Sequence, residues 1–201
     1  MALPATDVFT SASDQTLTAY SANWTNNHNV FQVVGATDRV RANTASADCM
    51  AHWNADAFNN AQYAQGVITL EFNDGGVAVR CHASAATGYA LTSSNFSTGT
   101  TYLYKYVTGT YTEISHNTEA WASSDTVRLE VSGTTLTPKR NGALSSIGTQ
   151  TDSAISSGSA GLAGYNNVNQ IQIDNWEGGN LVTNKATPIF HRRNYVWRRG
   201  F

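Results

Sequence analysis

Three tyrosines at alternate positions, Tyr102, Tyr104 and Tyr106, are the residues whose type and spacing best suit recognition chemistry. In an extended chain, side chains two residues apart share one face, so the three phenol rings form an aromatic row. An aromatic ring packs against the apolar face of a sugar, while its hydroxyl makes hydrogen bonds. The row is therefore a candidate glycan-stacking platform. The alternative is ordinary packing of tyrosine in the core or at its rim.

A second candidate set consists of His52, Arg80 and His82, which fall on the polar sides of two predicted strands. An arginine and two imidazoles on a shared polar sheet face can bind an anionic glycan. The alternative is a solvated polar face that binds nothing.

Cys49, His52, Cys81 and His82 have the side chains that zinc prefers. Strand parity argues against a zinc site, because Cys49 and His52 face opposite ways and so do Cys81 and His82. We expect buried thiols, polar-face histidines, no metal site and no cofactor. Whether the two thiols pair stays open, since geometry and compartment decide whether a disulfide forms.

The C-terminal segment has a charge of its own. Residues 185–201 hold five bases and no acid, whereas the remaining seven bases and all fourteen acids give residues 1–184 a net charge of −7. Aromatic and arginine side chains are the usual anchors of protein interfaces. The candidate partner-binding residues are Arg192, Arg193, Tyr195, Trp197, Arg198, Arg199 and Phe201.

Three kinds of partner are compatible with this segment. A protein surface is the leading prediction, with docking back onto the acidic body or binding to nucleic acid or a membrane as alternatives. An acidic body repels phosphate, so we expect no nucleic-acid partner and no membrane partner. A homo-oligomer and a glycan partner both stay open.

Strands must position these residues, and the segment Asp125–Gly142 shows them best. Apolar residues such as Leu129 alternate there with polar ones such as Glu130, which is the period of a half-buried strand. Pro138 predicts that the second strand of this hairpin lies at an edge or an end, and Asn141-Gly142 predicts a tight turn after it.

The composition favours strands and turns over the whole chain. Its 201 residues are 41% hydrophobic and 13% charged, against about 25% charged in a typical globular domain. Between ten and twelve short strands and no convincing helix predict an all-β, two-sheet antiparallel sandwich over residues 1–180, with a docking tail over 181–201. The N-terminus has no basic region and no long apolar core, so we expect no signal peptide and production in a reducing cytosol.

The order of the short motifs resembles the concanavalin A-like lectin/glucanase jelly roll, and within it the uncharacterised domains of phage and bacterial surface proteins. The resemblance covers residues 7–180. The residues that carry it are Asp7, Phe9, Trp24, 102–110, 126–141, Ser157-Gly158, Ala160-Gly161-Leu162 and 173–177.

The resemblance implies glycan binding, glycan cleavage or a structural role. The glucanase branch of the family presents alternating acids, Glu-x-Asp-x-Glu, but here Glu71, Asn73 and Gly75 hold that spacing with one carboxylate. Asp174 and Glu177 are three residues apart and face opposite sides of a regular strand. No catalytic residue is therefore carried over, and no nucleophile elbow or phosphate loop is present.

These observations predict a non-enzymatic structural protein of a phage particle. It would be a capsid decoration or tail-associated protein that is assembled in the host cytoplasm, is located in the virion and docks through its C-terminal tail onto a shell or tail protein. One alternative is a lectin-like glycan-binding module for host or surface attachment. The other is a glycan-cleaving enzyme with an unrecognised site.

Overall fold

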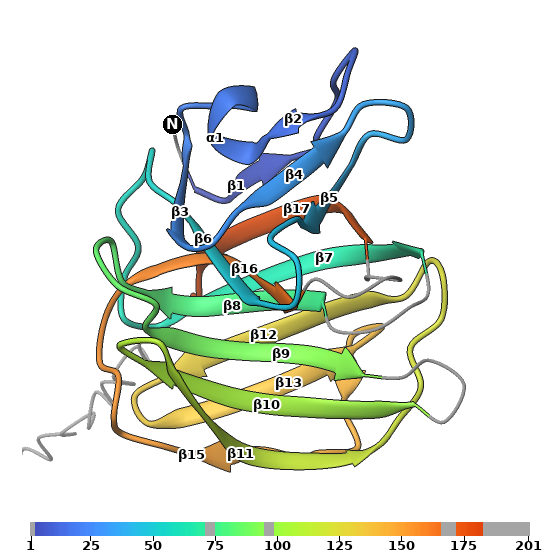
Figure 1. Ribbon diagram of the computed structural model, residues 1–201. Helices are drawn as coiled ribbons and strands as arrows, with labels where there is room; N and C mark the ends of the chain where they lie inside the picture. The colour runs from blue at the N-terminus through green and yellow to red at the C-terminus, as the bar shows by residue number, and fades with distance from the viewer. Residues whose placement is uncertain (1–2, 71–74, 95–98, 166–171, 183–201) are drawn as a thin grey trace, which may run out of the picture.

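The chain forms two antiparallel β-sheets that pack face to face, as the computed structural model shows (Figure 1). The structure describes residues 3–70, 75–94, 99–165 and 172–182. Within these ranges the single helix, α1 (Leu17–Tyr20), is one turn capped by the hydroxyl of Thr16. No helix in this part of the chain is long and apolar enough to cross a membrane. The predicted all-β sandwich is confirmed.

The first sheet has ten strands in the order β14-β13-β12-β7-β17-β5-β4-β2, with β1 paired to β17 and β15 paired to β13. Its strands are β1 (Ala5–Asp7), β2 (Gln15–Thr16), β4 (Phe31–Val34), β5 (Arg39–Ala42), β7 (Gln62–Leu70), β12 (Thr126–Ser132), β13 (Thr135–Arg140), β14 (Ala143–Leu144), β15 (Gln150–Thr151) and β17 (Gln172–Asn180).

The second sheet has seven strands in the order β11-β10-β9-β8-β16-β6-β3. Its strands are β3 (Trp24–His28), β6 (Asp48–Trp53), β8 (Gly75–Cys81), β9 (Gly88–Ser94), β10 (Thr100–Val107), β11 (Thr110–Thr118) and β16 (Ser159–Tyr165). The last two strands among the described residues therefore lie inside the sheets, β16 between β8 and β6 and β17 between β7 and β5.

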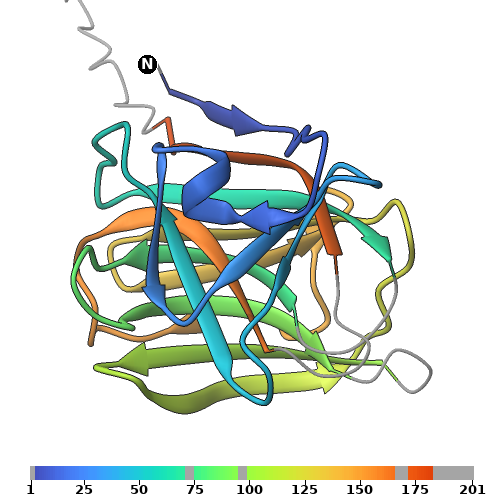
Figure 2. The same ribbon diagram turned by 45° about the horizontal axis from the view of Figure 1, so that its top comes forward.

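The core fills the space between the inner faces of the two sheets, and three of its tryptophans pack against one another. The ring centroids of Trp24 and Trp176 lie 4.7 Å apart, and those of Trp53 and Trp176 lie 5.6 Å apart. Figure 2 shows the N-terminal strands beside β17, and the register pairs Ala5 with Gly178. Burial of these rings thus joins segments from both ends of the described chain.

The hairpin β12–β13 follows the predicted alternation. Leu129 is fully buried in the core, whereas Glu130 faces the other way and pairs with Arg128 and Lys139 at 2.7 and 2.9 Å. Pro138 lies on β13, whose outer edge pairs with the two-residue strands β14 and β15. The predicted hairpin and its face assignment are confirmed.

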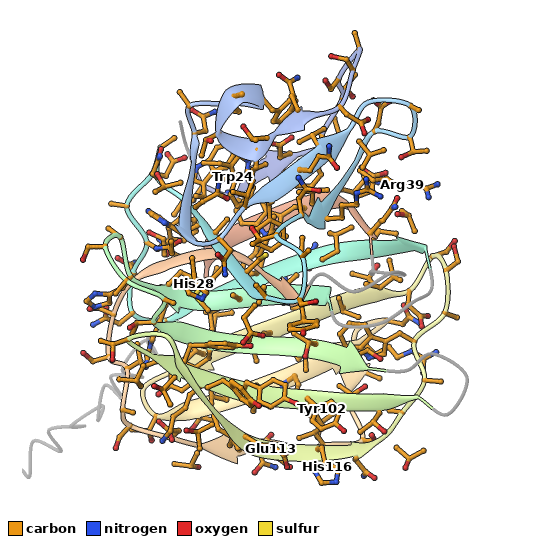
Figure 3. All side chains as sticks on the ribbon, viewed as in Figure 1. Trp24, His28, Arg39, Tyr102, Glu113 and His116 are labelled. Carbon is orange, nitrogen blue, oxygen red and sulfur yellow. The ribbon has the colours of Figure 1, made fainter. Side chains whose placement is uncertain are left out.

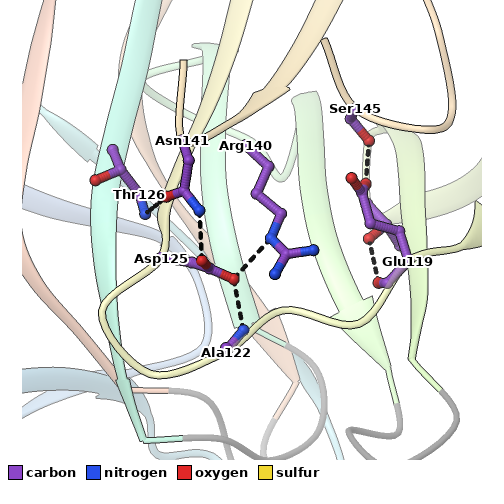
Figure 4. A network of polar contacts seen from close by, with 8 residues as sticks. Glu119, Ala122, Asp125, Thr126, Arg140, Asn141 and Ser145 are labelled. Carbon is purple, nitrogen blue, oxygen red and sulfur yellow. Dashed lines mark hydrogen bonds and ion pairs between the residues drawn. The ribbon is translucent and has the colours of Figure 1, made fainter. Parts of the chain in front are cut away.

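A polar network anchors the start of this hairpin (Figure 4). The carboxylate of Asp125 accepts hydrogen bonds from the backbone N–H of Ala122 at 2.6 Å, from Arg140 Nε at 2.7 Å and from Asn141 Nδ2 at 2.6 Å. Burial by itself raises the pKa of Asp125, but these three donors together hold it below its usual value. The network therefore favours the ionised carboxylate.

The strand β17 ends at Asn180, where the predicted sandwich domain also ends. The predicted division into residues 1–180 and 181–201 stays a prediction, because 183–201 lie outside the described residues.

Candidate functional site

The tyrosine row predicted on β10 lies on the outer face of the seven-stranded sheet. Leu103, between two of the tyrosines, is fully buried in the core, so Tyr102 and Tyr104 point away from it. Their rings are stacked with a centroid distance of 5.3 Å and an interplanar angle of 6°. Strand alternation is the cause of this arrangement, since residues on either side of a core-facing leucine must face outward.

A fourth ring extends the row onto the neighbouring strand. Tyr111 of β11 is the register partner of Tyr106 and is 59% exposed. Its ring centroid lies 5.8 Å from that of Tyr104, edge to face, and 6.3 Å from that of Tyr106. Tyr102, Tyr104, Tyr106 and Tyr111 are called the tyrosine cluster below.

Small side chains form the floor beside the tyrosine cluster. Ala78, Ala90 and Ala163, from three neighbouring strands, are fully buried together with Met50, and Tyr106 and Tyr104 pack against them. The alanines leave room because a methyl group rises little above the sheet. The two tyrosine rings can therefore lie close over the sheet surface.

The outer face is concave, as one hydrogen bond demonstrates. The hydroxyl of Tyr106 on β10 donates to Asp48 Oδ1 on β6 over 3.3 Å, although β9, β8 and β16 lie between these two strands. Four strand spacings in a flat sheet amount to roughly 19 Å, more than the two side chains can bridge. The sheet must therefore curl, so that β10 and β6 approach each other across its outer face.

A pocket of about 200 Å³ lies in this concave face. It is lined by residues from five strands, namely Asp48, Thr92, Tyr104, Tyr106, Tyr111, Gly164 and Tyr165. Pockets for drug-sized ligands span roughly 300–1,000 Å³, so this pocket suits a smaller group of about the size of one sugar ring. Aromatic walls, hydroxyl groups and a carboxylate converge on it.

Asp48 is the charged residue of the pocket lining. Burial raises the pKa of this carboxyl group above its usual value, although the Tyr106 hydroxyl and the nearby His28 oppose the shift. Every second residue of β6, counted from Asp48, lies on the same outer face, as the alternation of a strand requires. The fold thus holds an ionisable acid where its charged form is disfavoured, which is common at functional sites.

The rim of the tyrosine cluster carries a pair of polar side chains. His116 Nδ1 and Glu113 Oε1 lie 2.6 Å apart on the exposed strand β11, and the His116 ring lies 5.5 Å from that of Tyr102. Figure 3 shows these three residues together at the β10–β11 edge. A ligand on the cluster can therefore also meet an imidazole and a carboxylate at the rim.

Asn27 connects the two predicted histidines, away from the tyrosine cluster on the same sheet. His52 lies on the outer face of β6, is 4% exposed, and its Nδ1 is 2.8 Å from Asn27 Oδ1. The amide nitrogen of Asn27 also donates to the backbone carbonyl of His82, which lies exposed just after β8. Burial lowers the pKa of His52, so this imidazole favours its neutral form and is poorly suited to attract an anion.

Arg80 does not lie on the exposed sheet face, so the prediction that it shares such a face with the histidines is wrong. A register shift in the β8–β16 pairing and a φ of 53° at Arg80 turn its side chain inward, where it is 2% exposed. Its guanidinium donates to three backbone carbonyl groups, those of Asn60, Ile155 and Gly133. The β-bulge is the physical reason, because an extra residue reverses the alternation of a strand.

The same bulge separates the cysteines. Cys49 lies in the core between the sheets, whereas Cys81 lies with Met50 on the outer face, and both thiols are free and buried. Cys49 and Cys81 also lie on strands that are separated by β16. Within the described residues, no group of three or more His, Cys, Asp or Glu side chains is arranged to hold a metal ion.

Two predicted features lie outside the described residues. These are the candidate partner-binding residues of the C-terminal tail, between Arg192 and Phe201, and the acidic position Glu71. The prediction of a particle protein that docks through this tail therefore stays a prediction.

The pocket's carboxylate was not among the residues selected from the sequence. Asp48 is about 60 residues from Tyr106 in the chain and joins it through sheet curvature, which a period-two pattern does not encode. The sequence indicates only that Asp48 shares one face of a strand with Met50 and His52, because the three occupy alternate positions.

Comparison with known proteins places the fold. No family model and no curated protein matches the chain. Among solved structures, the carbohydrate-binding module CBM66 from Bacillus subtilis is similar over 77% of this chain and 95% of its own, with a TM-score of 0.58 and 15% identity. A Bacillus subtilis protein of unknown function with a galectin-like fold is similar over 88% and 94%, with a TM-score of 0.57 and 10% identity.

An enzyme is also among the similar structures. The GH43 protein BlXynB from Bacillus licheniformis is similar over 88% of this chain at a TM-score of 0.59 and 10% identity, but the chain spans 39% of that enzyme. At such identities the likeness shows the fold, and it confirms the lectin-like jelly roll that the resemblance implied. Function must be argued from the concave face.

Proposed function

We propose that this protein is a glycan-binding module that binds through the concave outer face of its seven-stranded sheet. The observation that carries the proposal is the tyrosine cluster beside the pocket, with stacked rings half-buried on a floor of alanines. Flat aromatic faces suit the apolar face of a sugar, and the pocket's hydroxyls and carboxylate suit its hydroxyl groups. The fold likeness to CBM66 over nearly the whole of that module supports the same class of ligand.

Binding without cleavage is part of the proposal. Glycosidases of the retaining and inverting types place two carboxyl groups on either side of the scissile bond. The described residues that line the pocket supply one carboxyl group, Asp48, and its neighbours are aromatic, hydroxyl-bearing or glycine residues. This composition favours recognition over hydrolysis.

The test is a binding screen of the full chain on a glycan array, followed by titration of the best oligosaccharide. We expect Tyr104→Ala and Tyr111→Ala each to weaken binding more than about fivefold, as anchoring aromatic residues do. Leu144→Ala is the matched control, because Leu144 is exposed on the other sheet. Thermal melts of all variants verify that each is folded.

Two results would contradict the proposal. One is an array on which the folded chain binds no glycan, and the other is glycan binding that both tyrosine variants retain in full. Release of reducing ends from a bound oligosaccharide would keep the surface and replace the non-catalytic interpretation with the enzymatic one.

A further inference from the structure

The charge pattern of the pocket restricts the glycans that can enter it. Among the described residues that line the pocket, Asp48 is the one charged side chain, and the others are Thr92, Gly164 and four tyrosines. The residues that were predicted to bind an anion do not line this pocket, since Arg80 is buried between the sheets and His52 is hydrogen-bonded to Asn27. Among the described residues, the pocket lining therefore presents a carboxylate and hydroxyl groups and no guanidinium, with His28 near Asp48.

The carboxylate is placed to accept hydrogen bonds. Its Oδ1 takes one from the Tyr106 hydroxyl at 3.3 Å, a long contact, while its backbone carbonyl takes one from Asn29 Nδ2 at 2.6 Å. A carboxylate has about four acceptor sites, so Asp48 can accept further hydroxyl donors. Sugar hydroxyl groups are such donors, and hydrogen bonds to an ionised acceptor are stronger than those to a neutral one.

A carboxylate or sulfate group of a ligand cannot bind at this site in the same way. Such a group offers hydrogen-bond acceptors where Asp48 needs donors, and like charges a few ångströms apart repel strongly in a partly desolvated pocket. A neutral sugar ring meets neither penalty, because its apolar face can lie on Tyr104 or Tyr111 while its hydroxyls point to Asp48.

We propose that the concave face selects neutral glycans, that Asp48 is the acceptor for their hydroxyl groups, and that it excludes uronic-acid and sulfated glycans. This inference rests on the proposed glycan-binding function and deepens it. It replaces the anionic ligand that the histidines and the arginine suggested with an uncharged one.

The ionised carboxylate of Asp48 lowers the stability of the folded state, and this supports a binding role for the residue. Since burial raises the pKa of Asp48, the ionised carboxylate is less stable in the folded chain than in the unfolded chain, and at neutral pH it opposes folding. A residue kept at such a cost at a concave surface is typical of a functional site.

The experiment compares Asp48→Asn with the unmodified full chain. The probes are neutral gluco-, galacto-, manno- and xylo-oligosaccharides on one array, together with uronate and sulfated oligosaccharides of matched length. For Asp48→Asn we expect a loss of about ten- to a hundredfold in affinity for the best neutral probe, the range of a hydrogen bond to a charged group. We also expect an equal or higher melting temperature and a smaller preference for neutral over anionic probes. Leu144→Ala, at an exposed position on the other sheet, is the control.

The outcomes separate this inference from the function on which it rests. If anionic probes bind better than neutral ones and Tyr111→Ala abolishes that binding, the glycan-binding function stands and the selection of neutral glycans is overturned. Full affinity of Asp48→Asn for neutral probes overturns the role of Asp48. A lower melting temperature for Asp48→Asn would make it a structural residue, and absence of binding to any probe overturns both proposals.

Discussion

At the scale of single residues, two aspartates on this chain have opposite environments. Asp48 lies where its charge is disfavoured, whereas Asp125 receives three hydrogen bonds, one of which is an ion pair with Arg140 at 2.7 Å. An ionised aspartate therefore destabilises the folded state at one position and stabilises it at the other. The difference lies in the local hydrogen-bond donors, which favour the ionised form.

We expect Asp125→Asn to lower the free energy of unfolding at pH 7 by about 1–3 kcal/mol, because the Arg140 guanidinium loses its partner and the other bonds lose their charge assistance. The pKa of Asp125 is held below its usual value, so its contribution is present above the pKa of an unfolded aspartate, about 3.9, and is lost as the pH falls through the lowered value. Denaturant melts from pH 7 to pH 2 should thus show the gap between the two proteins closing in acid. Glu113→Gln, at an exposed acid, is the control, and a gap that stays constant in acid would contradict the role of the charge.

At the scale of elements, strand alternation decides which substitutions are costly. Leu129→Ala removes a fully buried side chain from the core and should lower the free energy of unfolding by about 2–5 kcal/mol. Glu130→Ala changes the next residue, on the opposite face of β12, and should cost about 1 kcal/mol or less. Urea melts of both variants measure the difference, and equal losses would mean that the faces of the hairpin are assigned wrongly.

Alternation also explains how far the sequence predicts this structure. On β12, polar and apolar residues keep strict period two, and on β10 the tyrosines alternate with Leu103; the structure places Tyr102, Tyr104 and Leu129 on the expected faces. On β8 the same rule assigns Arg80 to the wrong face. The strand has a bulge there, and the residue with the positive φ is an arginine, so no turn-forming residue indicates the bulge in the sequence. The pocket could not be predicted without the curvature of the sheet, which arises from the twist of many strands together.

At the scale of the whole molecule, the sandwich and the basic C-terminal segment are separable in charge and composition. We propose that residues 185–201 serve a protein partner, while the concave face serves the glycan. Deleting 185–201 should leave the melting temperature unchanged and the affinity for the best glycan within twofold of that of the full chain. The same deletion should abolish any self-association or partner binding seen by sedimentation. Unfolding of the truncated chain would show instead that these residues belong to the sandwich.

The positions of the last two strands determine when the molecule can fold during synthesis. Because β16 and β17 lie inside their sheets, each sheet is divided into two parts until these strands have been made. At about 5–20 residues per second, the roughly 170 residues between β1 and β17 take on the order of 10–30 s to emerge. Trp24 and Trp53 lack Trp176 for that time, and the edges of β7 and β5 that pair with β17 stay open to wrong partners. We therefore expect the nascent chain to complete its two sheets only after β16 and β17 have emerged from the ribosome.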